Sequence, residues 1–200
     1  MPNHFNNQLV IIADSEHHDA ILKLISSNPG LTPPQGEDCS AEFRCLDFNK
    51  IIPMPTIFKN WSSGSNEIDG VSVNHWETIN GKEVAISNDV LEKMQKEHGA
   101  VGWYDRSVIN WGTKWNAYYC QGKKYLDSIF IDFHTAYSPP EPVYVKMSEI
   151  LHKEVPEIEL YARGVDEGYD YDDEDEVYYW AKNNHKEFWS INIKPGENTN

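Results

Sequence analysis

The sequence predicts an α+β fold in which helices lie on one face of an antiparallel sheet. Three features carry this prediction: an apolar run followed by a helical pattern near the N-terminus, two aromatic-rich strand patterns in the middle of the chain, and a proline-marked helix start followed by further strands. Because strands return after each helix, an α+β sandwich is the natural architecture.

The first part of the chain is predicted to hold a strand, a helix and a second strand. Residues 9–13 (LVIIA) are typical of a short buried strand, and the apolar spacing after them predicts a helix that reaches Ser26. The alternation in residues 42–48 (EFRCLDF) predicts the second strand, which Pro53 would end.

An inserted lobe is predicted at residues 56–100 of a single domain that spans residues 1–200. Tryptophans and glycines are scattered among polar residues in the first thirty positions of this lobe, so no strand pattern stands out. A helical pattern then begins at Ser87 or Asn88 and stops at Gly99, which is a typical C-terminal cap.

The second half is predicted to contain a strand pair, a helix and three further strands. In NWGTKWNAYY (110–119), Trp111, Thr113 and Trp115 alternate onto one side, and residues 125–137 form the partner strand after a turn at residues 121–124. The next helix begins at the Ser-Pro-Pro-Glu run and ends before Pro156. The remaining strands lie near residues 157–163, 176–182 and 186–193.

Composition narrows the classes of function. The formal charge of −15, from 17 basic and 32 acidic residues, argues against direct binding of DNA or RNA, which needs lysine and arginine to displace counterions. Such an acidic excess fits either simple solubility or attraction of a protein with a basic surface, including imitation of nucleic acid towards a protein that binds it. The 40% apolar content is enough for a sizeable core.

The cysteines and the N-terminus predict a cytoplasmic protein. Cys39, Cys45 and Cys120 form neither a disulfide framework nor a zinc motif, so free, mostly buried thiols are expected. We expect no signal peptide and no membrane partner, since the apolar runs are too short to span a bilayer.

An acidic segment is the first candidate site. Eight of the eleven residues from Asp166 to Glu176 are acidic, which fits a solvated hairpin tip or a docking site for a basic protein surface. A calcium loop is disfavoured because the sixth position counted from Asp170 is Asp175 and not glycine. The candidate partner-binding residues are Asp170, Asp172, Asp173, Glu174, Asp175 and Glu176.

A small-ligand site is the alternative. Lys114 would neutralise an anion, His134 would act as acid or base, and Glu167 would orient either group. Trp103, Trp111 and Trp115 form either an aromatic platform or core. The candidate ligand-binding residues are Trp111, Lys114, Trp115, His134 and Glu167.

No catalytic residue, metal or cofactor is predicted. The eight histidines are scattered and lack HExxH or paired cysteines, so zinc has no support. The chain also lacks GxSxG, phosphate-loop and GxGxxG motifs.

Several motifs in order resemble the YubB family of plasmid- and phage-encoded bacterial proteins, which includes Api-type phage proteins. They are MPNHFNNQLVI (1–11), DFNKIIPMP (47–55), the Trp103-Tyr104 pair, NWGTKWNAYY, FHTAYSPP (133–140) and DEGYDY (166–171). The chain departs from the family pattern after Gly168, where an acidic run replaces a short glycine-containing turn. The resemblance implies a ferredoxin-like domain but no agreed activity.

The preferred functional hypothesis is therefore a soluble accessory protein of a mobile element. It would be a non-catalytic, acidic protein-binding module that interferes with a host defence or nucleic-acid-handling protein. The alternative is a small-ligand-binding protein or enzyme that uses the pocket around Trp111 and His134.

Overall fold

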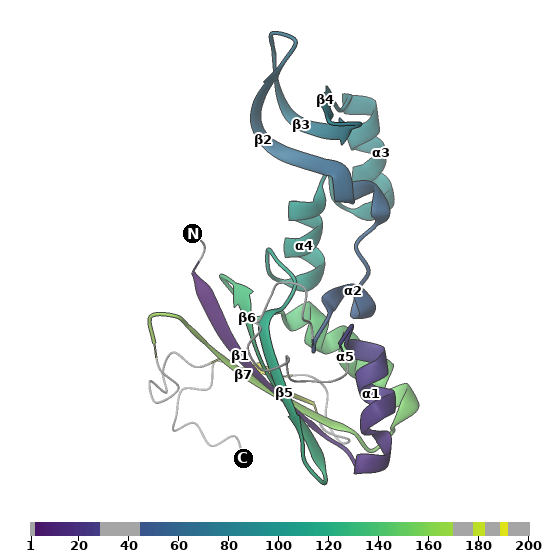
Figure 1. Ribbon diagram of the computed structural model, residues 1–200, viewed down its shortest axis with the longest axis vertical. Coiled ribbons are helices and arrows are strands. Elements are labelled where there is room, and N and C mark those ends of the chain that lie inside the picture. The colour runs from purple at the N-terminus through teal and green to yellow at the C-terminus, as the bar shows by residue number, and fades with distance from the viewer. Residues whose placement is uncertain (1–2, 29–44, 170–177, 183–188, 192–200) are drawn as a thin grey trace.

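The computed structural model describes residues 3–28, 45–169, 178–182 and 189–191, and these form a body and an arm (Figure 1). The body is a six-stranded sheet with helices packed on it. The arm comprises residues 56–98, which extend away from the body along the long axis of the molecule. Helix α4 (Trp103–Trp111) connects the two.

The sheet of the body is antiparallel throughout, which confirms the predicted α+β class. Strands β1 and β7 lie at its centre, since two further strands flank this pair on each side. From edge to edge the strands are β5 (Tyr118–Lys124), β6 (Ser128–Ala136), β1 (His4–Ile12), β7 (Glu159–Asp166), β8 (Tyr178–Lys182) and β9 (Trp189–Ile191).

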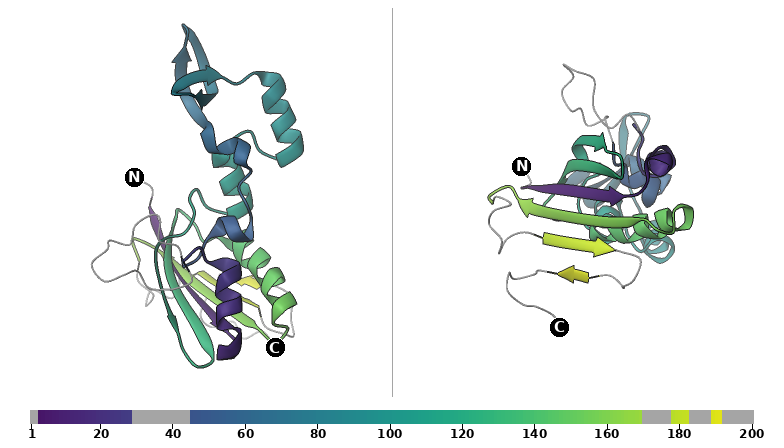
Figure 2. Two further views of the ribbon diagram at one scale, coloured as in Figure 1. Left: turned by 45° about the vertical axis from the view of Figure 1, so that its right-hand side comes forward. Right: turned by 90° about the horizontal axis from the view of Figure 1, so that it is seen from below.

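Helices cover one face of this sheet (Figure 2). They are the 3-10 turn η1 (Ser15–His17), α1 (His18–Ile25), α2 (Phe48–Ile51) and α5 (Glu141–Glu154). Leu9 and Ile11 of β1 point to this face and are fully buried, while the alternating residues Gln8 and Val10 are only partly buried. We call the opposite side of the sheet the open face.

The arm contains a second sheet and a helix. Its elements are η2 (Thr56–Asn60), β2 (Trp61–Ile68), β3 (Val71–Ile79), β4 (Lys82–Ala85) and α3 (Asn88–His98). Both hairpin turns, Asp69-Gly70 and Asn80-Gly81, have positive φ at their two central residues, as type I′ turns require. A small core of Phe58, Trp61 and Met94 holds the arm together.

The predicted strand over residues 110–119 is wrong for residues 110–117. Trp111 ends helix α4, and Gly112 caps that helix with φ at 75° before β5 begins at Tyr118. The four-residue spacing of Trp103, Ser107 and Trp111 fits one side of a helix as well as it fits strand alternation. The sequence pattern therefore did not separate the two structures, whereas burial of Trp111 against the body favours the helix.

Three local predictions are also corrected. The described part of the predicted strand 42–48 is not a strand: residues 45–47 lead into α2, which begins at Phe48 and is capped by Asp47 through a hydrogen bond from the Asn49 amide. The predicted turn at residues 121–124 belongs to β5. Ser138 does not cap α5; its hydroxyl donates to the Gly112 carbonyl oxygen instead, at 2.6 Å.

Other predictions are confirmed. Helix α3 stops at Gly99, α5 ends before Pro156, and Cys45 and Cys120 are buried and form no disulfide. Among the described helices, none has the length and apolar character needed to cross a membrane. Cys39 and the acidic segment at residues 170–176 lie outside the described residues.

Candidate functional site

Four strands bring polar and aromatic side chains together at one end of the open face. Tyr118 of β5 pairs with His134 of β6, which pairs in turn with Asn6 of β1. Cross-strand partners share a face, so these side chains are neighbours. His4, Tyr118, Tyr119 and His134 form what we call the His–Tyr cluster.

A hydrogen-bond chain fixes the first members of this cluster. The hydroxyl of Tyr118 donates to the Thr135 carbonyl oxygen at 3.1 Å and lies 2.7 Å from His4 Nδ1. The Tyr118 hydroxyl therefore links the backbone of β6 to the ring of His4.

Glu167 ties the end of β7 to the start of β1. Its carboxylate accepts a hydrogen bond from the His4 amide at 2.8 Å, and its own amide donates to the His4 carbonyl oxygen at 2.8 Å. The two bonds hold the backbone of His4 in place. They also fix where the chain leaves the sheet, three residues before Asp170.

The pKa values of His134 and Tyr118 are both shifted in the direction that favours the neutral side chain. Burial lowers the pKa of His134, the neighbouring His4 lowers it further, and Glu167 opposes the change. Burial also raises the pKa of Tyr118 to about 12, with smaller contributions from Tyr119 and Glu167. Among the described residues, Nδ1 of His134 is buried without a hydrogen-bond partner.

An irregularity in β5 gives the cluster its second tyrosine. The register between β5 and β6 shifts between Tyr118 and Gln121, and Tyr119 has φ at 50°. Two consecutive tyrosines consequently contact the same histidine, with ring centroids 5.8 Å and 5.4 Å from that of His134. Tyr119 remains 52% exposed, so its ring is accessible from solvent.

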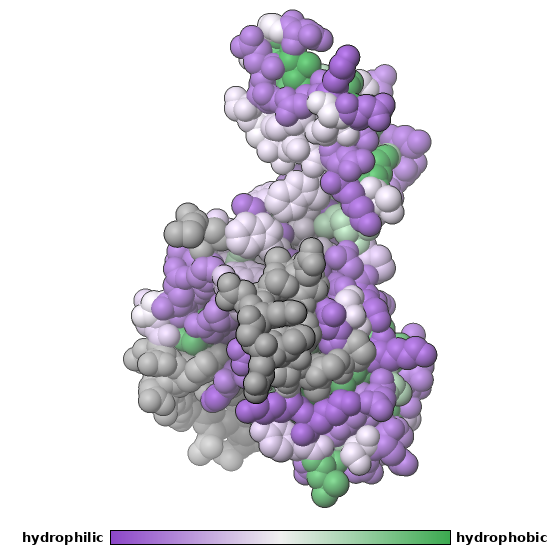
Figure 3. All heavy atoms as spheres, in the orientation of Figure 1, coloured by the Kyte–Doolittle hydropathy of each residue, from purple (hydrophilic) through white to green (hydrophobic). Residues whose placement is uncertain are grey.

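The aromatic surface continues from the cluster towards α4. The Trp115 ring lies 6.0 Å from that of Tyr118, and the Lys114 ammonium lies 5.1 Å from the Trp115 ring and 5.7 Å from the Tyr104 ring. Trp115 and Tyr104 are 38% and 41% exposed. In Figure 3 the surface between body and arm is mainly pale, the colour of residues of intermediate hydropathy such as Trp and Tyr.

The predicted ligand-binding residues divide into two groups. Lys114, Trp115, His134 and Glu167 all lie around Tyr118, linked by the contacts given above. Trp111 instead belongs to the core, where it is 5% exposed and its indole nitrogen donates to the Ile52 carbonyl oxygen.

The sequence did not identify His4, Tyr104, Tyr118 and Tyr119 as members of the site. The doubled tyrosine was the available signal, because strict alternation would bury one of the two. Trp103 packs against the arm core, so the three tryptophans share no platform.

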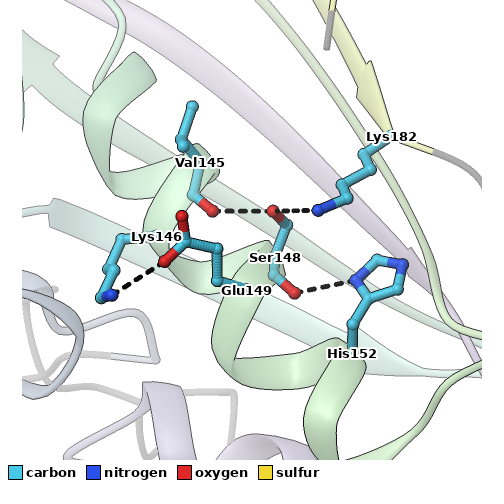
Figure 4. A network of polar contacts seen from close by, with 6 residues as sticks. All are labelled: Val145, Lys146, Ser148, Glu149, His152 and Lys182. Atoms are coloured by element: carbon cyan, nitrogen blue, oxygen red, sulfur yellow. Dashed lines mark hydrogen bonds and ion pairs between the residues drawn. The ribbon is translucent and has the colours of Figure 1, made fainter. Parts of the chain in front are cut away.

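A second polar network lies between α5 and β8, on the covered side of the sheet (Figure 4). Lys182 Nζ donates to Ser148 Oγ at 3.2 Å, and that hydroxyl donates to the Val145 carbonyl oxygen at 2.7 Å. A lysine beside a serine is the arrangement of some nucleophilic sites. Here the serine hydrogen points into its own helix and Ser148 is fully buried, so the network joins β8 to α5.

The described residues contain no group of three or more His, Cys, Asp or Glu side chains arranged to hold a metal ion. Comparison of the chain with protein-family models, curated proteins and solved structures gives no match. The resemblance to the YubB family stays a prediction that rests on the sequence motifs.

Proposed function

We propose that this protein is a non-catalytic binding module that recognises a basic segment of another protein. The observation that carries the proposal is the paired hydrogen bonding of Glu167 with His4. It makes the chain leave β7 beside the His–Tyr cluster, so the acidic run from Asp170 to Glu176 follows within a few residues of an exposed aromatic surface.

The acidic run and the aromatic surface both favour contact with a positively charged partner. Carboxylates attract lysine and arginine over several ångströms and raise the rate of encounter, an effect that the charge of −15 strengthens. Aromatic faces attract the same cations at short range through the ring quadrupole. A protein segment rich in lysine and arginine would be attracted by both the carboxylates and the aromatic faces.

The order of elements supports a ferredoxin-like fold for the body. The chain runs β1, α1, β5, β6, α5, β7, and the four strands lie in the order β5-β6-β1-β7 with antiparallel neighbours. This order matches the split β-α-β arrangement with two helices on one face, which supports the proposal. The arm is then an insertion between α1 and β5, and β8 and β9 extend the sheet.

The resemblance to plasmid- and phage-encoded proteins adds the biological part of the proposal. A cytoplasmic host protein that handles nucleic acid presents a basic surface, which an acidic module can occupy in place of DNA or RNA. The module thereby blocks a defence or nucleic-acid-handling activity of the host.

The test uses a fluorescein-labelled oligo-arginine peptide, with binding followed by anisotropy at physiological salt. One variant changes Asp170, Asp172, Asp173, Glu174, Asp175 and Glu176 to Asn or Gln, and a second changes Tyr119 to Ala. A control removes acidic charge from α3 of the arm through Glu92→Gln and Glu97→Gln.

We expect both site variants to weaken binding and the α3 control to retain it. Because the control removes two charges and the acidic-run variant removes six, the losses are compared per charge removed. An equal loss per charge would mean that the peptide responds only to net charge, and the proposed site would be rejected. Capture of host proteins by wild-type protein and the acidic-run variant, followed by mass spectrometry, then identifies the partner.

A second candidate function is the binding of a small planar ligand at the His–Tyr cluster. It is favoured by Nδ1 of His134, which has no hydrogen-bond partner among the described residues and lies in a ring surrounded by those of His4, Tyr118 and Tyr119. Titration with free nucleosides, followed through the histidine ring signals in NMR spectra, tests it. Saturable shifts that disappear in His134→Phe would support the ligand site, and unchanged spectra would exclude it for this class.

A further inference from the structure

Lys114 occupies an unusual position in the aromatic surface. Its ammonium lies within reach of two rings at once, 5.1 Å from the centroid of Trp115 and 5.7 Å from that of Tyr104. Cation–π attraction operates within about 6 Å of a ring centroid. In the part of the chain that the structure describes, no carboxylate forms an ion pair with this ammonium.

The two rings come from different elements and keep free surface. Tyr104 belongs to the first turn of α4, whereas Trp115 follows Gly112, whose left-handed conformation turns the chain out of that helix. Both side chains are more than one-third exposed although Lys114 lies beside them. A second cation can therefore approach the same rings from solvent.

We infer that Tyr104 and Trp115 form a recognition site for an arginine side chain of the basic partner, and that Lys114 is an internal ligand which this arginine displaces. The inference rests on the proposed function, since it names the chemical group that the aromatic surface recognises. Guanidinium is planar and weakly hydrated and stacks on aromatic faces, whereas the lysine ammonium is a compact, strongly hydrated charge. The arginine therefore gains more from the rings than Lys114 loses by returning to water.

Displacement of Lys114 has a measurable consequence for affinity. An exposed cation–π contact is worth a factor of about two to five in an equilibrium constant. Removing the internal ligand through Lys114→Gln should tighten binding of an oligo-arginine peptide by about that factor. Replacing either ring through Tyr104→Leu or Trp115→Leu should weaken binding, and both residues are exposed enough for the fold to tolerate leucine.

A double-mutant cycle separates displacement from simple charge repulsion, because Lys114→Gln also removes a positive charge. If Lys114 competes for the rings, its substitution should have little effect once Trp115 is leucine. If Lys114 only repels the peptide, Lys114→Gln should tighten peptide binding equally when Trp115 is leucine. The variant Lys123→Gln, on β5, measures what loss of one lysine charge does elsewhere on the body.

The NMR signals of the Lys114 side chain provide a readout that does not depend on affinity. Methylene groups held over aromatic rings are shifted upfield, so the ε-methylene of Lys114 should move from an upfield position to that of a free lysine as the peptide is added. The inference would be supported by upfield Lys114 signals in the free protein that return to the free-lysine position on binding. It also requires that the increase in peptide affinity caused by Lys114→Gln disappears when Trp115 is leucine.

Three results would overturn it, and they distinguish it from the proposed function. Peptide binding that is lost in the acidic-run variant but unaffected by Tyr104→Leu and Trp115→Leu would reject the arginine site alone. If Lys114→Gln still increases peptide affinity when Trp115 is leucine, Lys114 is not displaced from the rings by the peptide. Absence of binding by both wild-type protein and Lys114→Gln would reject the site together with the proposed function.

Discussion

The body and the arm are both antiparallel sheets that carry helices, but they are stabilised differently. Strand β1 of the body buries alternate residues under α1 and α5, whereas all four residues of β4 in the arm are exposed. Only Phe58, Trp61 and Met94 are buried within the arm. A three-stranded sheet without a continuous apolar face has little independent stability. The arm therefore depends on its turns and on a few aromatic contacts, while the body depends on its core.

The largest effect is expected from a cavity in the body. Phe133 on β6 is 1% exposed and packs edge-on against Phe48, with ring centroids 6.2 Å apart. Phe133→Ala should lower the free energy of unfolding by about 3–5 kcal/mol. Urea denaturation followed by circular dichroism measures this loss. A loss below about 1 kcal/mol would mean that β6 does not lie in the main core.

The matching substitution in the arm should have a local effect. Phe58 is fully buried, with its ring centroid 5.5 Å from those of both Trp61 and His98. Phe58→Ala should abolish amide exchange protection in β2 and β3 while β1 and β6 keep theirs, because regions with few buried contacts open separately from the core. Equal loss of protection in both sheets would show instead that arm and body unfold as one unit.

A smaller effect is expected at the junction between the two regions. Gly112 has φ at 75°, and a Cβ there would lie 2.8 Å from Pro142 Cδ and 3.2 Å from the Pro139 carbonyl oxygen. Gly112→Ala should destabilise the protein by about 2 kcal/mol, from left-handed strain of about 1–2 kcal/mol and from crowding against α5. Thermal unfolding measures the change.

Gly99 provides the control for this crowding. It also caps a helix with positive φ, at 70°, but no heavy atom lies within 4 Å of its ideal Cβ position. Gly99→Ala should therefore cost only the backbone strain. Equal destabilisation of the two variants would mean that crowding of the added Cβ against Pro139 and Pro142 contributes nothing to the loss of stability.

The comparison also explains how far the sequence could predict the fold. Helices α1, α3 and α5 could be predicted because their apolar spacing and end signals are local. The arm sheet was missed because its strands bury almost nothing and so lack alternation. The Asp-Gly and Asn-Gly turns at residues 69–70 and 80–81 were the usable signal, since type I′ turns favour these pairs.

Only part of the candidate site could be predicted, because some of its residues are close in the sequence and others are brought together by the fold. Lys114, Trp115 and His134 stand out as polar or aromatic residues in one short region. His4 and Tyr104 join them only through strand pairing and chain reversal, which act between residues far apart in sequence. Trp111 was assigned to the site because residues 110–119 were interpreted as one strand on which Trp111 and Trp115 share a side, whereas Trp111 ends helix α4.

The smallest expected effect is a pH dependence that belongs to the body alone. Burial and the neighbouring His4 lower the pKa of His134 below its ordinary value of 6.5 in the folded protein. The unfolded chain therefore binds more protons than the folded protein as pH falls through 6.5, and stability falls with it. His134→Gln should lack this contribution, so wild-type protein should lose more stability than the variant between pH 7.5 and pH 5.5.

His4→Gln tests the cause of that lowered pKa directly. It removes the adjacent imidazole that disfavours a charge on His134 but leaves the burial of His134 largely in place, so the NMR titration midpoint of His134 should move up towards its ordinary value. A midpoint that does not move would mean that burial alone controls His134. The rings of His4 and His134 would then be neighbours without electrostatic coupling, and protonation of one would not affect ligand binding at the other.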